Sequence, residues 1–280
     1  MKLKPILAAT AMAAFIFCLN SCKKADVKEE FETTFELSSD QAISDNLTQD
    51  ANDVFMQVAV ENNVAGGNFA PGPVTSNNFF PCATITITPL VGFPKNIVID
   101  FGTSCTAPNG VVRSGKINIT LSDSVRKPGS IAVMTFDNYY VSGYKVEGTY
   151  TWKNTSTANT RSWERKTENG KVTAPGGRYW LHEGLRNVVQ TGGVNTPLNL
   201  TDDVFSVTGN HRVTNAAGAY RDITVMEALQ KKNSCSDIDK GKLKVQGPNH
   251  YAIINFGDGT CDNLATLSID GMPERVIILR

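Results

Sequence analysis

The sequence predicts an all-β protein in which many short antiparallel strands form a sandwich or a strongly curved sheet, with one N-terminal amphipathic helix. Glycine is frequent, with 23 among 280 residues, and Thr, Asn and Val recur between the glycines. That texture is typical of strands joined by turns. Helical and strand patterns do not alternate along the chain, which argues against a parallel α/β fold.

The first element along the chain is a segment typical of a secretory signal peptide. Lys2 and Lys4 form a basic start, and residues 5–19 carry no charge. This apolar run is shorter than the roughly 20 residues of a membrane-spanning helix, and it fits the hydrophobic region of an export signal. It ends in the quartet LNSC at residues 19–22.

The LNSC quartet resembles the lipobox of bacterial lipoproteins, which ends in the cysteine that receives the lipid. The resemblance implies that residues 1–21 are a signal peptide, that cleavage follows Ser21, and that Cys22 carries a diacylglyceryl group. It also implies further acylation, for example by palmitate, and anchoring in a Gram-negative outer membrane. Several acyl chains, at about 0.8 kcal/mol per buried methylene, give lasting attachment. The alternative is ordinary secretion, with Cys22 merely close to the cleavage site.

Residues 22–38 predict a flexible, solvated tether, because they are rich in Lys and Glu. Lys23 and Lys24, with Asp26 soon after, partly resemble the surface-export signal of some Gram-negative lipoproteins. Ala25 stands where that signal has its first acidic residue, which leaves the membrane face open between periplasm and cell surface. The partial match favours the cell surface slightly.

The β-rich domain is expected over residues 39–280 and begins with the helix. From Ser39 to Asn62, apolar residues recur at helical spacing, among them Ile43, Leu47 and Val54. We expect this stripe to pack across an open face of the sheet. Residues 225–232 could add one short helical turn.

The charge balance excludes one class of partner. The whole chain has 27 basic and 27 acidic residues, and removal of residues 1–21 takes away Lys2 and Lys4 but no acid. The mature chain is therefore slightly acidic and lacks the basic field that attracts nucleic acid.

Four cysteines remain after Cys18 leaves with the signal peptide and Cys22 takes the lipid. In an exported chain an even number of cysteines predicts disulfides, with three connectivities open. A metal site is the rival reading, but no CxxC spacing occurs and the three histidines are scattered. The four are Cys82, Cys105, Cys235 and Cys261.

An internal repeat in the sequence favours one of these three disulfide connectivities. Residues 81–121, the N-terminal unit, and residues 234–270, the C-terminal unit, each run from a cysteine through a strand, a turn, a strand, a second cysteine and a further strand. Because the two cysteines of each unit bracket a hairpin, we predict the pairs Cys82–Cys105 and Cys235–Cys261. Closing each loop contributes about 3 kcal/mol.

The stretch NFGDGTCDN at residues 255–263 contains the weak metal-ligand candidates Asp258 and Asp262. The matching stretch of the N-terminal unit, DFGTSCTAPN, lacks these acids. A calcium loop would also need an ordered series of oxygen ligands and a bidentate Glu. We therefore expect a tight turn and a disulfide here, with no metal and no cofactor.

The clearest strand, residues 144–153, alternates aromatic or apolar with polar residues. If the aromatic side chains of this region faced solvent they would form a platform for a glycan or an envelope protein. The alternative is packing beneath the sheet. The candidate surface consists of Tyr144, Tyr150, Trp152, Trp163 and Trp180.

No catalytic motif is found in the sequence, so an enzyme is not expected. The first hypothesis is a lipid-anchored envelope lipoprotein with a non-catalytic binding or structural role. The second is a periplasmic lipid-handling half-barrel carrier, which requires an apolar concave cavity. The third, an envelope hydrolase on a β scaffold, requires acids converging in a cleft.

Overall fold

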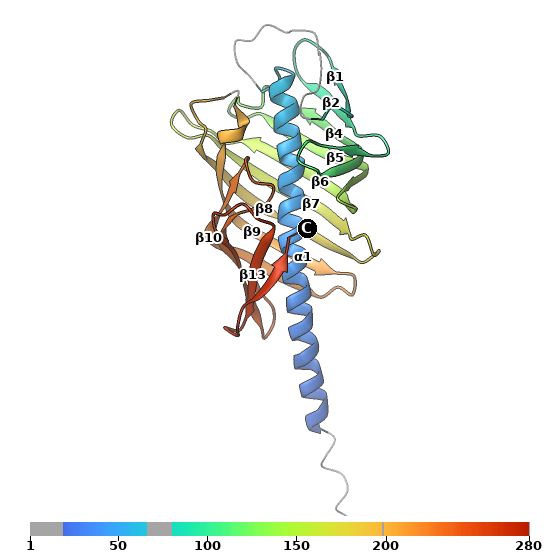
Figure 1. The fold of residues 1–280 in the computed structure, drawn as a ribbon, viewed down its shortest axis with the longest axis vertical. Coiled ribbons are helices and arrows are strands. Elements are labelled where there is room, and N and C mark those ends of the chain that lie inside the picture. Colours follow the sequence, from blue (N-terminus) through green and yellow to red (C-terminus); the bar gives the residue numbers. More distant parts are fainter. Residues whose placement is uncertain (1–18, 66–79, 198, 280) are drawn as a thin grey trace, which may run out of the picture.

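The protein consists of one long helix and one antiparallel sheet of 14 strands, which confirms the predicted all-β class. The computed structural model describes residues 19–65, 80–197 and 199–279. The sheet is strongly curved, and helix α1 (Leu19–Glu61) runs along its concave side, with the N-terminal end of the helix projecting beyond the strands (Figure 1). The strongly curved sheet, and not the sandwich, is therefore the observed form.

The strands follow one another as an antiparallel meander from β1 to β14, with the short β3 pairing beside the main path on β4. A turn of a few residues suffices between antiparallel neighbours, which explains the turn-rich sequence. The strands are β1 (Thr84–Thr88), β2 (Lys95–Asp100), β3 (Cys105–Thr106), β4 (Val112–Leu121), β5 (Ile131–Val141), β6 (Tyr144–Asn154), β7 (Ser162–Thr173), β8 (Tyr179–Gly192), β9 (Val204–Asn215), β10 (Tyr220–Lys232), β11 (Lys240–Gln246), β12 (Tyr251–Asp258), β13 (Leu264–Ile269) and β14 (Arg275–Ile278), with a 3-10 turn η1 (Leu200–Asp202) before β9.

Irregular pairing bends the sheet around the helix. The register shifts within each neighbouring pair from β4–β5 to β11–β12. Such bulges bend a strand and increase its twist. At Gly115 (φ 76°) a Cβ atom would lie 2.0 Å from the Asn138 carbonyl oxygen, and at Gly148 (φ 117°) it would lie 2.7 Å from the Gly170 Cα. Only glycine fits these two positions, so the sequence encodes the curvature directly.

The helix extends further towards the N-terminus than predicted. The prediction of a flexible tether over residues 22–38 is wrong, because α1 continues through these residues. Thr34, Leu37 and Ser38 are also buried. Glu30 accepts hydrogen bonds from the backbone N–H groups of Asn249 (2.7 Å) and His250 (3.2 Å). Tertiary contacts of this kind stabilise helices that local composition does not favour.

Residues 225–232 are likewise not helical, because they belong to β10 and pair with β9 and β11. Pairing on both sides outweighs the helical propensity of the local sequence. The helix predicted from Ser39 is confirmed, and its stripe of Ile43, Leu47 and Val54 is buried in the core.

Candidate functional site

The interface between α1 and the sheet is rich in polar side chains as well as apolar ones. Between Leu37 and Ala59 most helix residues are buried, because the curved sheet encloses the helix on nearly all sides. A buried polar group without a hydrogen bond lowers stability, so these groups need partners on the strands. The buried polar residues of the helix are Thr34, Ser38, Asp40, Gln41, Ser44, Asn46, Gln49, Asp50 and Asn52.

Asp50 forms the most enclosed ion pair with the sheet. The Arg113 guanidinium of β4 donates from Nη2 (2.6 Å) and Nε (3.0 Å) to its two carboxylate oxygens, and both side chains are buried. Burial lowers the pKa of Arg113, but the charge of Asp50, its hydrogen bonds and the neighbouring Tyr139 together outweigh burial and hold that pKa above its usual range. Bidentate pairing of this kind fixes orientation as well as energy.

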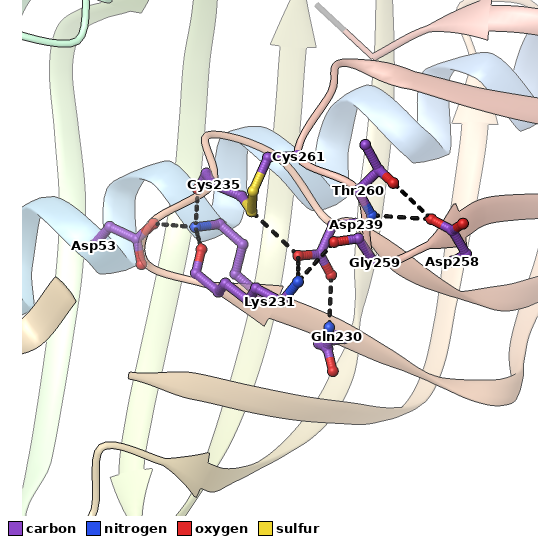
Figure 2. Close-up of a disulfide and its surroundings, with 10 residues drawn as sticks. Asp53, Gln230, Lys231, Cys235, Asp239, Asp258, Gly259, Thr260 and Cys261 are labelled. Atoms are coloured by element: carbon purple, nitrogen blue, oxygen red, sulfur yellow. Dashed lines mark hydrogen bonds and ion pairs between the residues drawn. A yellow bond between two sulfur atoms is a disulfide. The ribbon is translucent and has the colours of Figure 1, made fainter. Parts of the chain in front are cut away.

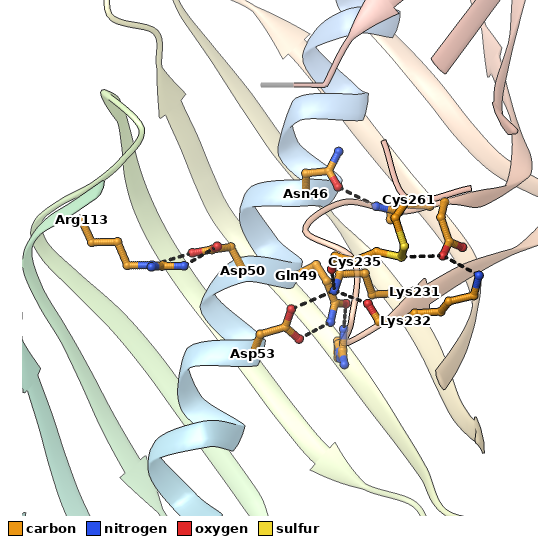
Figure 3. A network of polar contacts seen from close by, with 12 residues as sticks. Asn46, Gln49, Asp50, Asp53, Arg113, Lys231, Lys232, Cys235 and Cys261 are labelled. Carbon is orange, nitrogen blue, oxygen red and sulfur yellow. Dashed lines mark hydrogen bonds and ion pairs between the residues drawn. A yellow bond between two sulfur atoms is a disulfide. The ribbon is translucent and has the colours of Figure 1, made fainter. Parts of the chain in front are cut away.

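Asp53 lies on the same side of the helix, one turn further on, and meets a cation from the opposite direction (Figure 3). The Lys231 Nζ of β10 lies 3.2 Å from its carboxylate, with the lysine side chain only 1 % exposed. The ammonium also donates to the carbonyl oxygens of Cys235 (2.7 Å) and Lys232 (2.8 Å). The helix therefore holds the early strands through Asp50 and the late strands through Asp53.

A cleft of about 230 Å³ opens between these two contacts, and we call it the seam cleft. Asp50 and Asp53 of the helix contribute to its floor. One wall comes from residues 107–109, just after Cys105, and the other from residues 233–236 around Cys235. The cleft thus lies where the N-terminal and C-terminal units approach each other across the helix. Its lining combines apolar groups, among them Val54, Phe80 and Leu200, with amides and hydroxyls that can hydrogen-bond to a small ligand.

Both predicted disulfides are confirmed. Cys82 and Cys105 are bonded with their Cα atoms 5.4 Å apart, and Cys235 and Cys261 are bonded with their Cα atoms 5.2 Å apart. Each bond joins an exposed cysteine, Cys82 or Cys261, to a buried one. The repeat in the sequence therefore corresponds to a repeated covalent design.

The acids around the second disulfide hold turns (Figure 2). Asp258 accepts hydrogen bonds from the backbone N–H (3.1 Å) and hydroxyl (2.8 Å) of Thr260, and Asp262 accepts one from the backbone N–H of Leu264 (3.0 Å). Among the described residues, the only potential metal-ligand group is Cys235, Asp239 and Cys261. Its two sulfur atoms are bonded to each other, which leaves Asp239 as one carboxylate beside Lys232 (3.4 Å).

The aromatic residues proposed as an exposed platform face the helix instead. Trp152, Trp163, Trp180 and Tyr150 are buried, and Tyr144 is partly buried against the same core. The exposed-platform reading is therefore wrong for this set, and packing beneath the sheet is what occurs. The alternation in β6 was correct, but alternation alone does not say which face is covered.

These inward aromatic residues also hydrogen-bond to the helix. The Trp180 indole N–H donates to the Ser44 hydroxyl (2.8 Å), and the Trp152 indole N–H donates to the Asn52 side-chain oxygen. Trp and Tyr combine a large apolar body with one polar atom, which suits a core that contains a polar helix.

Two buried histidines on the neighbouring strands β8 and β9 are in contact. His182 Nδ1 lies 3.1 Å from His211 Nε2, and His182 Nε2 lies 3.4 Å from the Tyr150 hydroxyl. Burial, then the charge of Arg186, lowers the pKa of His182 to about 4, and the pKa of His211 also falls well below its usual value. The pair could be found only through the β8–β9 register, which places Gly184 opposite His211.

Cys22 lies near the start of α1, although its side chain is outside those that the structure describes. Within the described residues, no helix is both long and apolar enough to cross a bilayer. No known protein family, no curated protein and no solved structure matches the chain.

Proposed function

We propose that the protein is a lipid-anchored envelope lipoprotein with a non-catalytic binding or structural role. The observation that carries this proposal is the position of the lipobox-like quartet at the very start of α1, the helix that the sheet encloses further along. Glu30, which contacts the β11–β12 turn, follows Cys22 by about two helical turns, or roughly 12 Å of axial rise. A lipid on Cys22 would thus hold the domain close to the membrane on a helical stalk.

The ionisable groups of the seam cleft favour a binding role over a catalytic one. Asp50 and Asp53 face this cleft, as a hydrolase would require, but each is ion-paired to a cation of the sheet. Carboxylates committed in this way position α1, and their charges are already compensated. A small polar ligand, such as part of an envelope glycan, matches the hydrogen-bonding groups that remain.

The lipid-carrier alternative has less support. It requires an apolar cavity on the concave side of the sheet, where α1 lies in this structure. Leu37, Leu47 and Phe55 fill that space and are fully buried. A carrier would therefore need the helix to leave the sheet and to break its ion pairs with Arg113 and Lys231.

The anchor is tested by replacing Cys22 in the natural host and following the protein through membrane fractionation. We expect wild type to fractionate with outer membrane and to incorporate a labelled fatty acid, and Cys22→Ser to lose the label and the membrane association. Cys18→Ser is the matched control, because Cys18 lies within the predicted signal segment. Equal labelling of wild type and Cys22→Ser would contradict the proposal.

The membrane face is tested by protease treatment of intact cells, with a periplasmic lipoprotein as control. The partial export signal at Lys23 and Lys24 leads us to expect loss of the protein while the control survives. Protection until the outer membrane is broken would place it on the periplasmic side and would contradict surface display.

A further inference from the structure

Three loops meet at the end of the sheet where β4, β6 and β8 finish, and they enclose a second cavity. The parts of these loops that enclose it are residues 122–130, 155–161 and 193–197. The cavity has a volume of about 290 Å³. It lies apart from the seam cleft and shares no lining residue with it. Its lining includes Arg126, Asn154, Ser156, Arg161, Trp163 and Asn195.

Two guanidinium groups line this cavity without a close counter-ion. Among the described residues, neither Arg126 nor Arg161 has a carboxylate within ion-pair distance, whereas Arg113, Arg178, Arg186 and Arg212 each have one. Burial, then the like charge of Arg161, lowers the pKa of Arg126. Two half-buried cations that repel each other are stabilised by an anion between them.

The nearest acid compensates for these cations only in part. Asp203 interacts electrostatically with both arginines, but it is 5 % exposed and accepts a hydrogen bond from Gln190 (2.7 Å). Burial, then the charge of Asp202, raises the pKa of Asp203 to about 6. Asp203 is therefore largely ionised at neutral pH and faces two guanidinium groups, which are the charged residues of the cavity lining.

Neutral hydrogen-bond donors accompany the two cations. The Trp163 indole lines the cavity with its ring almost fully buried, and its N–H group has no partner in the part of the chain that the structure describes. A buried N–H without a partner is uncommon and often marks a place for a ligand or a water molecule. The hydroxyl of Thr157 and the amide of Asn195 surround the same space, while the Ser156 hydroxyl donates to the Ser162 carbonyl oxygen (3.3 Å).

We propose that this cavity binds an oxyanion, either a free one such as phosphate or sulfate, or one carried on a sugar, such as a carboxylate. Planar guanidinium groups recognise the oxygen atoms of such groups, and the surrounding hydroxyls and amides fit a hydroxylated remainder. The volume accommodates a ligand of monosaccharide size. This site goes beyond the proposed function, because it names a ligand class and does not depend on the anchor.

The test is calorimetric titration of the mature chain, produced as Cys22→Ser, with inorganic phosphate, sulfate, glucuronate and neutral glucose. We expect saturable binding of at least one anion and none of glucose. Tighter binding of glucuronate than of the inorganic ions would identify a sugar-borne anion, and the reverse order a free one. Binding should weaken as salt increases, since the interaction is electrostatic.

Variants locate the binding. Arg161→Gln and Arg126→Gln should each weaken it about tenfold or more, while Arg212→Gln, which removes an exposed arginine paired to Asp222 on another surface, should leave it unchanged. Thermal melting of each variant confirms that it is folded. The absence of saturable binding to every anion, or equal weakening by Arg212→Gln, would overturn the proposal.

Discussion

The N-terminal and C-terminal units share one covalent design but contact the helix in different ways. The closest backbone approaches of α1 are to β8–β13, which include the C-terminal unit. There the Ile238 N–H donates to the Asn46 side chain (3.0 Å), and Lys231 binds Asp53 beside the disulfide. The N-terminal unit forms the β1 end of the sheet, and its principal polar link to the helix is Arg113–Asp50.

This difference shows that a repeated disulfide hairpin need not have a repeated role. In the N-terminal unit the disulfide restrains an edge strand, β1, whose residues are exposed or only partly buried. In the C-terminal unit it restrains the loop that lies against the helix. An edge strand without a partner tends to fray or to pair with other chains, so restraint there limits disorder at the edge. Restraint of the inner loop instead preserves the core.

The largest expected effect comes from removing the polar link of the N-terminal unit. Arg113→Met leaves Asp50 buried without its cation, and we expect a loss of about 4 kcal/mol in the free energy of unfolding, measured by urea denaturation. The double variant Arg113→Met with Asp50→Leu should recover much of this loss. Arg212→Met, at an exposed ion pair, should lose less than about 1 kcal/mol. A small effect of Arg113→Met would show that the N-terminal unit does not depend on this contact.

The next effect compares the two disulfides directly. Their sequence separations are 23 and 26 residues, so the entropy that each removes from the unfolded chain is nearly equal. We expect Cys82→Ser with Cys105→Ser to lose about 3 kcal/mol and Cys235→Ser with Cys261→Ser about 4 kcal/mol, since only the latter also loosens a loop against α1. Equal losses, measured by urea denaturation of both double variants, would remove the distinction between the units.

Acidification should destabilise the protein by a smaller amount, because it protonates His182 and His211, which lie on strands between the two units. The pKa of His182 is about 4 in the folded protein and 6.5 in the unfolded chain, so the unfolded chain binds more protons as pH falls through this window. Its contribution to stability is complete above pH 6.5, decreases on acidification and amounts to a loss of about 2 kcal/mol by pH 5.

The raised pKa of Asp203 makes the folded protein more stable as pH falls, which opposes the effect of the histidines. The histidine contribution is therefore obtained by comparing the pH dependence of stability in wild type with that in the double variant His182→Gln with His211→Gln. Urea denaturation at pH 7.5 and pH 5 measures it. A single unfolding transition at pH 5 would mean that both units unfold together with the strands between them. Two transitions would show that one unit stays folded after those strands have unfolded. No difference in pH dependence between wild type and the variant would contradict the buried neutral pair.

The smallest effect concerns the end of the C-terminal unit nearest to the start of the helix. Glu30→Gln weakens hydrogen bonds to Asn249 and His250, and because the carboxylate lies at the surface and is only partly buried we expect a loss below about 1 kcal/mol. Hydrogen exchange of the β11–β12 turn should nevertheless accelerate. Unchanged exchange would show that the turn is fixed by the strands alone.

The sequence predicted what depends on local periodicity and on the repeat. The alternation from Tyr144 to Trp152 specified β6, and the matching cysteine spacings specified both disulfides. Contacts between distant segments were not accessible in this way. Residues 22–38 have the composition of a tether, yet Glu30 and Thr34 are held by β10 and the β11–β12 turn.

The candidate sites depended even more on long-range geometry. Alternation assigned Trp152 and Trp163 to a face, but the covering of that face by α1 follows only from the complete curved sheet. Arg126 and Arg161 come from separate loops, and no local pattern joins them. The cavity between them arises from the order and curvature of the strands. In the sequence this curvature is indicated only by glycines that lie far apart.

The polar contacts along α1 also determine how the protein responds to mechanical force. A pull on the N-terminus, as from an anchor in a moving membrane, acts along the helix axis. It therefore shears contacts that lie side by side along the helix, among them those of Asp40, Ser44, Gln49, Asp50 and Asp53, so that they share the load. A terminal β-strand pulled from its end would instead be unzipped one bond at a time. The arrangement suits an attachment that must withstand tension while the sheet around it stays folded.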